Sequence, residues 1–262
     1  MPTPTYDDDL RLAHVLADTA DAQTMDRFRA LDLRVETKPD LTPVSDADRA
    51  VEEAMRATLR RVRPRDAVVG EEFGHAGHGP RRWVVDPIDG TKNFVRGVPV
   101  WATLIALMDG DVVVAGVVSA PALGRRWWAA RGSGAWTGRS LSSANRVAVS
   151  PVQRLGDVSF SYSSLSGWEE RGRLDGFLAL ARSVWRTRAY GDFWSHMLVA
   201  EGAVDASAEP EVSLWDVAAL QVVVEEAGGA VTDLSGRCRP DGGSLVCSNG
   251  RVHGQILHFL GD

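Results

Sequence analysis

The first 63 residues contain two segments in which apolar positions recur at the spacing of an α-helix. In the segment 7–30, one face collects Leu10, Ala13, Ala17 and Ala20, with Leu12 and Leu16 beside it. A second helical pattern begins near Ser45, whose side chain is suited to capping a helix N-terminus, and runs to about Arg63. We therefore predict two helices, separated by a short strand (LRVETK) and a polar loop (PDLTPVS).

Strand patterns dominate from residue 67 to about residue 150. AVVGEEF is an apolar run that ends in two glutamates, and WVVDPID is a second run that carries two aspartates. The longest apolar stretch, WATLIALMDGDVVVAGVVSAP, is interrupted by Asp-Gly-Asp at 109–111. This interruption predicts two strands joined by a turn, not a membrane span. The Gly/His-rich segment GHAGHGP is expected to form a solvated loop.

After residue 150, strand patterns alternate with helical ones. The strand patterns are VSFSYSS, WRTRAYGD, DASAEP, AVTDL and SLVCSN, and the helical ones are LDGFLALARSVW, FWSHMLVAEGAV, LWDVAALQVVVEEAGG and RVHGQILHFL. The third helix presents Val217, Leu220, Val224 and Ala227 on its apolar face. The change of pattern predicts two subdomains, 1–148 and 149–262, without a flexible linker between them.

Composition and charge exclude several classes of protein. The 262 residues are 44% hydrophobic and 24% charged, as in an ordinary globular chain. A net charge of −6 without a basic stripe argues against a nucleic-acid partner. The N-terminus has neither the basic nor the apolar region of a signal peptide, so we expect a cytoplasmic protein with no membrane partner. The chain has only two cysteines, Cys238 and Cys247, which are too few for a zinc site. We expect both to be reduced, and a disulfide that joins neighbouring strands is the alternative.

Acidic residues stand at four places where the pattern predicts burial. They are Glu71 and Glu72 at one strand end, Asp86 and Asp89 around the next, and Asp46 and Asp216 in the first turns of helices. Each has an ordinary explanation in turn chemistry or helix capping. Strand ends share one edge of a sheet, however, and anions that converge there are costly without a cation. Hard oxygen ligands without His or Cys favour Mg²⁺ or Mn²⁺.

A Gly-Thr step follows the two aspartates directly. Backbone N–H groups after Gly90 and the hydroxyl of Thr91 can bind an anion such as a phosphate. Metal-binding carboxylates beside a phosphate-binding turn favour phosphoryl transfer, in which Thr91 can orient an attacking water. A plain helix cap is the alternative role for Thr91.

Three segments of the chain resemble a known family. They are GEE at 70–72, WVVDPIDGTKNF at 83–94 and WDVAALQVVVEEAGG at 215–229. They are similar to motifs of the inositol monophosphatase superfamily of metal-dependent phosphatases and occur in the same order. The resemblance covers nearly the whole chain and implies an α+β fold (α/β layered), the α-β-α-β-α sandwich. It also implies hydrolysis of a phosphomonoester by water activated between two Mg²⁺ ions, with no covalent phosphoenzyme. A metal-binding regulatory protein without catalysis is the alternative from another class.

The resemblance also assigns roles to individual residues. Glu71, Asp86 and the carbonyl oxygen of Ile88 match ligands of a first metal, and Asp86, Asp89 and Asp216 match ligands of a second. The phosphate-binding turn of the family is matched by Asp89, Gly90 and Thr91. The catalytic group that activates the water is matched by Asp46, Thr91 and Glu71. Glu72 matches a neighbouring acid without a defined role. Relatives are commonly dimers, which implies a homodimer.

The segment 189–205 bears on the substrate. In the superfamily, the residue at Gly191 borders the substrate pocket, the residue at Asp192 faces the leaving group, and Glu209 matches a position that touches the substrate. Two carboxylates with aromatic neighbours suit a cationic phosphate ester. GDFWSH, with the segments 32–48 and 90–101, resembles the histidinol-phosphate phosphatases of this superfamily in high-GC bacteria. The alternative activities are those of a broad inositol-1-monophosphatase and a bisphosphate nucleotidase. The alternative roles of the two acids are capping of a helix by Asp192 and simple solvent exposure of Glu209.

Other aromatic side chains have simpler expected roles. We expect His196 to be a partly buried histidine with its hydrogen bonds satisfied, and Trp127, Trp128 and Trp185 to lie in the core or a subunit interface. Trp194 fits the core and the pocket equally well.

Overall fold

The computed structural model describes residues 6–39 and 42–261. Two parts of the sequence-based predictions therefore fall outside the described residues: the first five residues of the N-terminus and positions 40–41 of the polar loop. The helices are α1 (Asp7–Arg27), α2 (Asp46–Val62), α3 (Thr91–Val95), α4 (Ser166–Glu170), α5 (Leu174–Ser183), α6 (Asp192–Ala200), α7 (Leu214–Glu226) and α8 (His253–Leu260). None of the described helices is both long and apolar enough to cross a membrane.

The strands form one ribbon and two sheets. The ribbon pairs β1 (Val35–Thr37) with β2 (Pro43–Ser45). The larger sheet has the order β10 (Ser143–Val147), β9 (Ala135–Ser140), β8 (Arg125–Ala130), β7 (Val112–Ala120), β6 (Ala102–Asp109), β5 (Arg81–Asp89), β3 (Ala67–Gly70) and β4 (Gly74–Ala76). The smaller sheet has the order β12 (Arg186–Arg188), β11 (Ser159–Ser161), β13 (Ala206–Glu209), β15 (Leu245–Ser248) and β14 (Ala230–Thr232).

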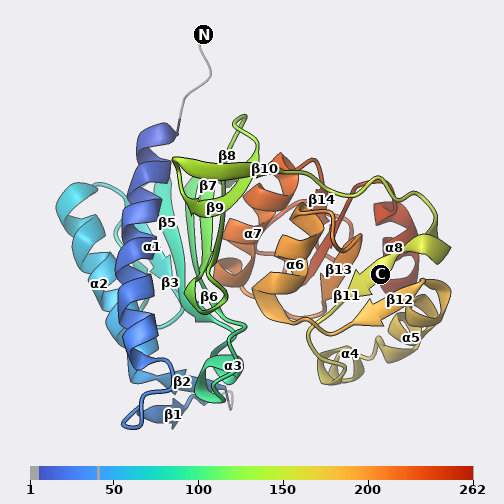
Figure 1. The fold of residues 1–262 in the computed structure, drawn as a ribbon, viewed down its shortest axis with the longest axis horizontal. Coiled ribbons are helices and arrows are strands. Elements are labelled where there is room, and N and C mark those ends of the chain that lie inside the picture. The colour runs from blue at the N-terminus through green and yellow to red at the C-terminus, as the bar shows by residue number, and fades with distance from the viewer. Residues whose placement is uncertain (1–5, 40–41, 262) are drawn as a thin grey trace.

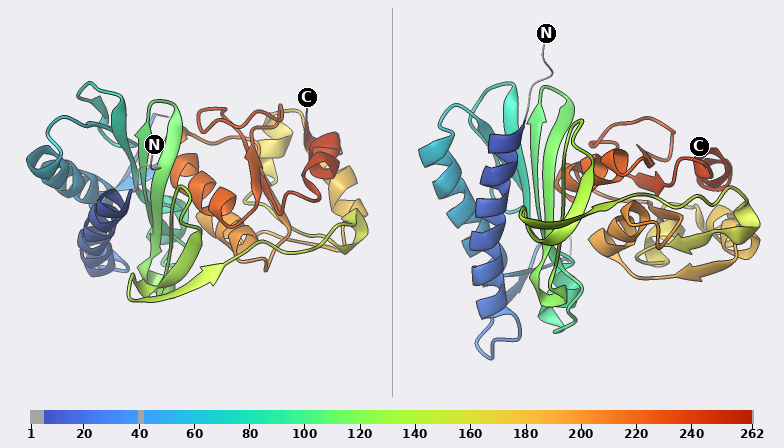
Figure 2. Two further views of the ribbon diagram at one scale, coloured as in Figure 1. Left: turned by 90° about the horizontal axis from the view of Figure 1, so that it is seen from above. Right: turned by 45° about the horizontal axis from the view of Figure 1, so that its top comes forward.

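Five layers follow one another across the molecule (Figures 1 and 2). Helices α1 and α2 cover the outer face of the larger sheet, α6 and α7 fill the space between the two sheets, and α5 and α8 cover the far face of the smaller one. One hydrophobic cluster lies under α1 and α2 around Leu16 and Trp83, and another joins the larger sheet to α6 and α7. The predicted α-β-α-β-α sandwich is confirmed.

Helix α7 is buried more completely than its sequence pattern indicates. Every residue from Val217 to Val224 is buried, not only the predicted apolar face. The reason is that α7 packs against β5–β8 of the larger sheet and also against β14 and β15 of the smaller one. Residues of the C-terminal half therefore complete the core of the N-terminal sheet.

Several short elements depart from the predictions. Strand β4 lies in the predicted GHAGHGP loop, β2 ends the predicted polar loop, and α4 occupies a segment without a predicted element. Trp127 and Trp128 are buried as expected, but Trp185 is 65% exposed beside the edge strand β12. Both cysteines are free thiols, Cys238 exposed and Cys247 buried.

Candidate active site

Two carboxylates of the site come from the end of β5. This strand lies between β3 and β6, and its pairing with β6 is interrupted between Asp86 and Asp89. Asp86 is buried, and its Oδ1 accepts a hydrogen bond from the Ile88 N–H at 3.0 Å. Oδ2 of Asp89 accepts a hydrogen bond of 2.9 Å from the N–H of Phe193, in the first turn of α6. The interruption of the ladder thus turns both side chains toward the layer of α6 and α7.

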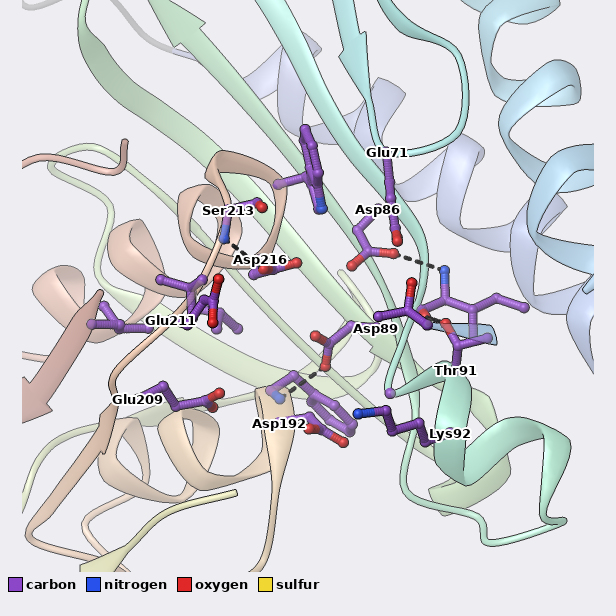
Figure 3. Close-up of a pocket in the computed structure, with 18 of the residues that line it drawn as sticks. Glu71, Asp86, Asp89, Thr91, Lys92, Asp192, Glu209, Glu211, Ser213 and Asp216 are labelled. Atoms are coloured by element: carbon purple, nitrogen blue, oxygen red, sulfur yellow. Dashed lines mark hydrogen bonds between the residues drawn. The ribbon is translucent and has the colours of Figure 1, made fainter. Parts of the chain in front are cut away.

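A third carboxylate enters from the first turn of α7. Oδ2 of Asp216 accepts a 2.7 Å hydrogen bond from the N–H of Ser213, the residue that caps this helix. Ligand oxygens of Asp86, Asp89 and Asp216 all lie within 4.8 Å of one another. Figure 3 shows the three side chains pointing into one cavity, with Thr91 and Glu71 at its edge.

The electrostatics of this cluster favour a bound cation. Burial raises the pKa of Asp86 well above its ordinary range, and the negative charge of Glu71 adds to this effect. Burial likewise raises the pKa of Asp89, and the charge of Asp192 adds to it. Burial also raises the pKa of Asp216 to about 7, against the hydrogen bond from Ser213. Three acids that resist ionisation together, and that offer only oxygen ligands, fit a hard divalent cation.

Glu71 lines the same cavity but has a protein partner. Its Oε1 lies 2.7 Å from the Nζ of Lys38, which also contacts Oε1 of Glu72 at 2.6 Å. Burial disfavours the charge on Lys38, but the two glutamates outweigh it and raise the pKa of the ammonium. The ammonium thus compensates a glutamate pair beside the three aspartates, a contact that sequence patterns do not reveal.

Thr91 is paired with a different aspartate from the one predicted. Its hydroxyl donates to the carbonyl oxygen of Ile88 at 2.9 Å and lies 3.4 Å from Oδ1 of Asp48. Asp48 is buried, and this burial raises its pKa to about 6 despite two hydrogen bonds from Ser45. Oδ2 of Asp46 instead contacts Arg27 at 2.9 Å. The predicted pairing of Asp46 with Thr91 is wrong.

The reason lies in the geometry of the helix start. Ser45 caps α2, and Asp48, three residues later, folds back so that its Oδ2 accepts from the Ser45 N–H at 2.8 Å. This capping box leaves Oδ1 of Asp48 facing Thr91, whereas Asp46 at the first helical position points to α1. The spacing Ser-x-x-Asp was the available signal, and it recurs as Ser213 and Asp216.

Further acids line the other end of the cavity, which has a volume of ≈ 380 Å³. Asp192 begins α6 at a positive φ of 44°, and its Oδ2 lies 3.1 Å from Nδ2 of Asn93. Glu209 is held by Nε2 of His196 at 3.1 Å and by the hydroxyl of Ser163 at 3.0 Å. Gly191 precedes Asp192 with φ 87°, and it is not among the residues that line the cavity.

His196 changes the balance of charge between these two acids. Its Nδ1 lies 2.8 Å from the hydroxyl of Ser207, so its hydrogen bonds are satisfied as predicted, but the side chain is 1% exposed and thus fully buried, not partly buried. Burial opposes a charge on the ring, but Cys247 and Glu209 favour it and raise its pKa to about 10. Glu209 therefore has two protein partners, His196 and Ser163, whereas Asp192 faces the cavity near Lys92.

Comparison with known proteins places the chain in a family. The profile of the inositol monophosphatase family matches residues 7–260. The chain belongs to this family. It is 69% identical to a histidinol-phosphatase of Streptomyces coelicolor, over 98% of each chain. It is 60% identical to a histidinol-phosphatase of Mycobacterium tuberculosis, over 97% of this chain and 98% of the relative.

Solved structures of the inositol monophosphatase family share the fold. An inositol monophosphatase from Zymomonas mobilis superposes with a TM-score of 0.86 at 30% identity, over 98% of this chain and 99% of that one. An IMPase from Thermotoga maritima superposes with a TM-score of 0.85 at 29% identity, over 97% and 96%. As a member of this family of metal-dependent phosphatases, the protein is a phosphoric monoester hydrolase.

Proposed function

We propose that this protein is a histidinol-phosphatase, which hydrolyses L-histidinol phosphate to L-histidinol and phosphate in histidine biosynthesis. The observation that carries the proposal is the acidic side of the cavity, where Asp192 lies beside the carboxylate cluster. The substrate carries an ammonium and an imidazole on its leaving group, and an inositol ring carries neither. Two relatives of 69% and 60% identity bear the same name, which supports the assignment.

The metal we propose is Mg²⁺, with Mn²⁺ as a substitute. Asp86, Asp89 and Asp216 would hold it, with Glu71 and the carbonyl oxygen of Ile88 at the edge of the set. When bound, the metal supplies positive charge that stabilises the phosphoryl group and lowers the pKa of a coordinated water.

The protein's own groups then position the reactants. Backbone N–H groups that follow Gly90 face the phosphate position, and the hydroxyl of Thr91 orients the attacking water. Asp48, within 3.4 Å of that hydroxyl, would receive the Thr91 proton once the O–H turns from the Ile88 carbonyl to Asp48, while the hydroxyl oxygen takes a proton from the water. Beside the cluster, Asp192 binds a cationic group of the leaving alcohol, because Glu209 already has His196 and Ser163 as partners. Asn93 holds one oxygen of Asp192, which leaves the other for the substrate.

A panel of phosphate esters tests the assignment. With Mg²⁺ present, kcat/KM for histidinol phosphate should exceed that for inositol 1-phosphate and for a 3′,5′-bisphosphate nucleotide by at least tenfold. The reason is that only the first has a cation for Asp192 to bind. Faster hydrolysis of inositol 1-phosphate would reject the substrate while keeping the class of reaction. No turnover of any ester would favour a non-catalytic metal-binding protein.

We also propose that the protein is a cytoplasmic enzyme, as expected for the biosynthetic reaction proposed above, and that it forms a homodimer, as the family resemblance implies. Sedimentation velocity at micromolar concentration measures the assembly directly; a single species at the mass of one 28.3 kDa chain would reject it.

A further inference from the structure

A stripe of buried charge runs along α2 away from the catalytic cavity. Asp48, Glu52 and Arg56 follow one another at intervals of four residues, so they share one face of the helix. All three are buried, with Glu52 completely inaccessible to solvent. Asp48 contacts Thr91, but the reaction outlined above uses neither of the other two. Buried ionic groups are costly unless they are fully paired, so the partners of Glu52 and Arg56 indicate what the pair does.

The partners of Glu52 are the backbone of the turn that carries Glu71. Its Oε2 accepts a 2.7 Å hydrogen bond from the N–H of Glu72, and its Oε1 accepts one of 3.2 Å from the N–H of Phe73. Oε1 also accepts from Nε of Arg56 at 2.7 Å. The carboxylate thus binds the turn at the two residues that directly follow Glu71.

Arg56 fixes the far end of the same turn. Its guanidinium donates to the carbonyl oxygen of Gly74 and stands 6.0 Å from the centre of the Phe73 ring. At the near end, a Cβ at Gly70 would lie 2.1 Å from Oε1 of Glu52, so only glycine permits this approach. The segment 70–74 is therefore held at its beginning, middle and end by one ion pair on α2.

We propose that the Glu52–Arg56 pair is a positioning unit for the metal ligand Glu71. It fixes the turn after β3 so that the Glu71 side chain faces Asp86 and the cavity. The inference rests on the proposed assignment of Glu71 to the metal-binding set. Groups that orient metal ligands in this way typically change metal affinity by 10–100-fold when they are replaced.

Glu52→Gln tests the proposal, because glutamine keeps the size of the side chain but presents an N–H₂ group to donors of the turn. We expect the Kd for Mg²⁺, measured by calorimetry without substrate, to rise by about 10–100-fold. At saturating Mg²⁺, kcat should return close to the parent value, since Glu52 touches no reacting atom.

Asp205→Asn is the matched control. Asp205 is also a buried acid that binds backbone, accepting from the Ser159 N–H at 2.6 Å, but it lies just before β13 of the smaller sheet and does not line the cavity. This variant should lower Tm and leave the Mg²⁺ Kd unchanged. An unchanged Kd in Glu52→Gln, or an equal rise in both variants, would overturn the proposal.

Two further variants separate the possible failures. Arg56→Lys keeps the charge but loses the Nε contact, so its Mg²⁺ Kd should rise in the same direction by a smaller factor. If Glu52→Gln does not fold, an unchanged Kd in Arg56→Lys overturns the positioning role. Glu71→Gln addresses the underlying assignment: if it binds Mg²⁺ as tightly as the parent, the ligand role of Glu71 is wrong.

Discussion

At the scale of single residues, two aspartates two positions apart have different surroundings. Asp48 is buried with one oxygen toward Thr91, whereas Asp46 is partly exposed and paired with Arg27. Both stand in the first turn of α2, and composition alone cannot distinguish them. The difference arises because only the third helical position folds back onto the capping residue.

The two aspartates provide a matched pair of variants. Asp48→Asn should lower kcat by about 10²–10⁴-fold, because asparagine preserves the helix cap but cannot accept the proton relayed through Thr91. Asp46→Asn should leave kcat within about threefold of the parent, since it alters only a partly exposed ion pair. Steady-state kinetics at saturating Mg²⁺ measure both. Comparable losses in the two variants would contradict the assignment of Asp48.

At the scale of elements, the start of α6 connects the carboxylate cluster to the proposed substrate-binding side of the cavity. Phe193 donates its N–H to Asp89, while the preceding Asp192 adopts the left-handed region at φ 44°. A non-glycine residue in that region is uncommon and is often associated with function. The charge of Asp192 also raises the pKa of Asp89, so this acid opposes the stability of the metal-free protein.

Asp192→Asn should therefore separate stability from activity. Asparagine tolerates the same backbone region, and the loss of one negative charge should raise the Tm of the metal-free protein. We expect kcat/KM for histidinol phosphate to fall by roughly 10–100-fold, the range for loss of a hydrogen bond to a charged group. Hydrolysis of a phosphate ester with an uncharged leaving group should change less than threefold. An equal loss on both esters would mean that Asp192 does not recognise the cation.

The extent to which elements could be predicted depends on how local their determinants are. The end of β5 was predictable, because Asp86, Asp89 and the Gly-Thr step lie within six consecutive residues. The burial of α7 on all sides from Val217 to Val224 was not, since it depends on two sheets formed by distant parts of the chain. The contacts of Lys38 with Glu71 and Glu72 could not be predicted either, because they join residues more than 30 positions apart and produce no periodic pattern in the sequence.

At the scale of the whole molecule, the proposed metal site lies where the layers meet. Asp86 and Asp89 come from the larger sheet, and Asp216 comes from the helix layer that packs against both sheets. Repulsion within the cluster therefore acts across the interface between layers. A cation that relieves it should stabilise the entire fold and not only a local loop.

The pKa shifts predict how this stabilisation depends on pH. The pKa of Asp216 is about 7 in the folded protein against an ordinary value of 3.8, and the pKa values of Asp86 and Asp89 are also raised well above that ordinary value. Between the unfolded and folded pKa values the folded protein binds more protons. The free energy of unfolding of the metal-free protein should thus decrease as pH rises from about 4 through 7.

Mg²⁺ should reverse this loss, because it replaces the protons that the three carboxylates retain. We expect the increase in Tm on adding excess Mg²⁺ to be larger at pH 8 than at pH 5, by an amount corresponding to a few kcal/mol. Differential scanning fluorimetry in EDTA and in Mg²⁺ measures it at each pH. Asp216→Asn removes one titrating group, so it should flatten the pH dependence in EDTA. An equal Mg²⁺-induced increase in Tm at both pH values would mean that the carboxylates are ionised without the metal. In that case the buried cluster would not destabilise the metal-free protein as inferred.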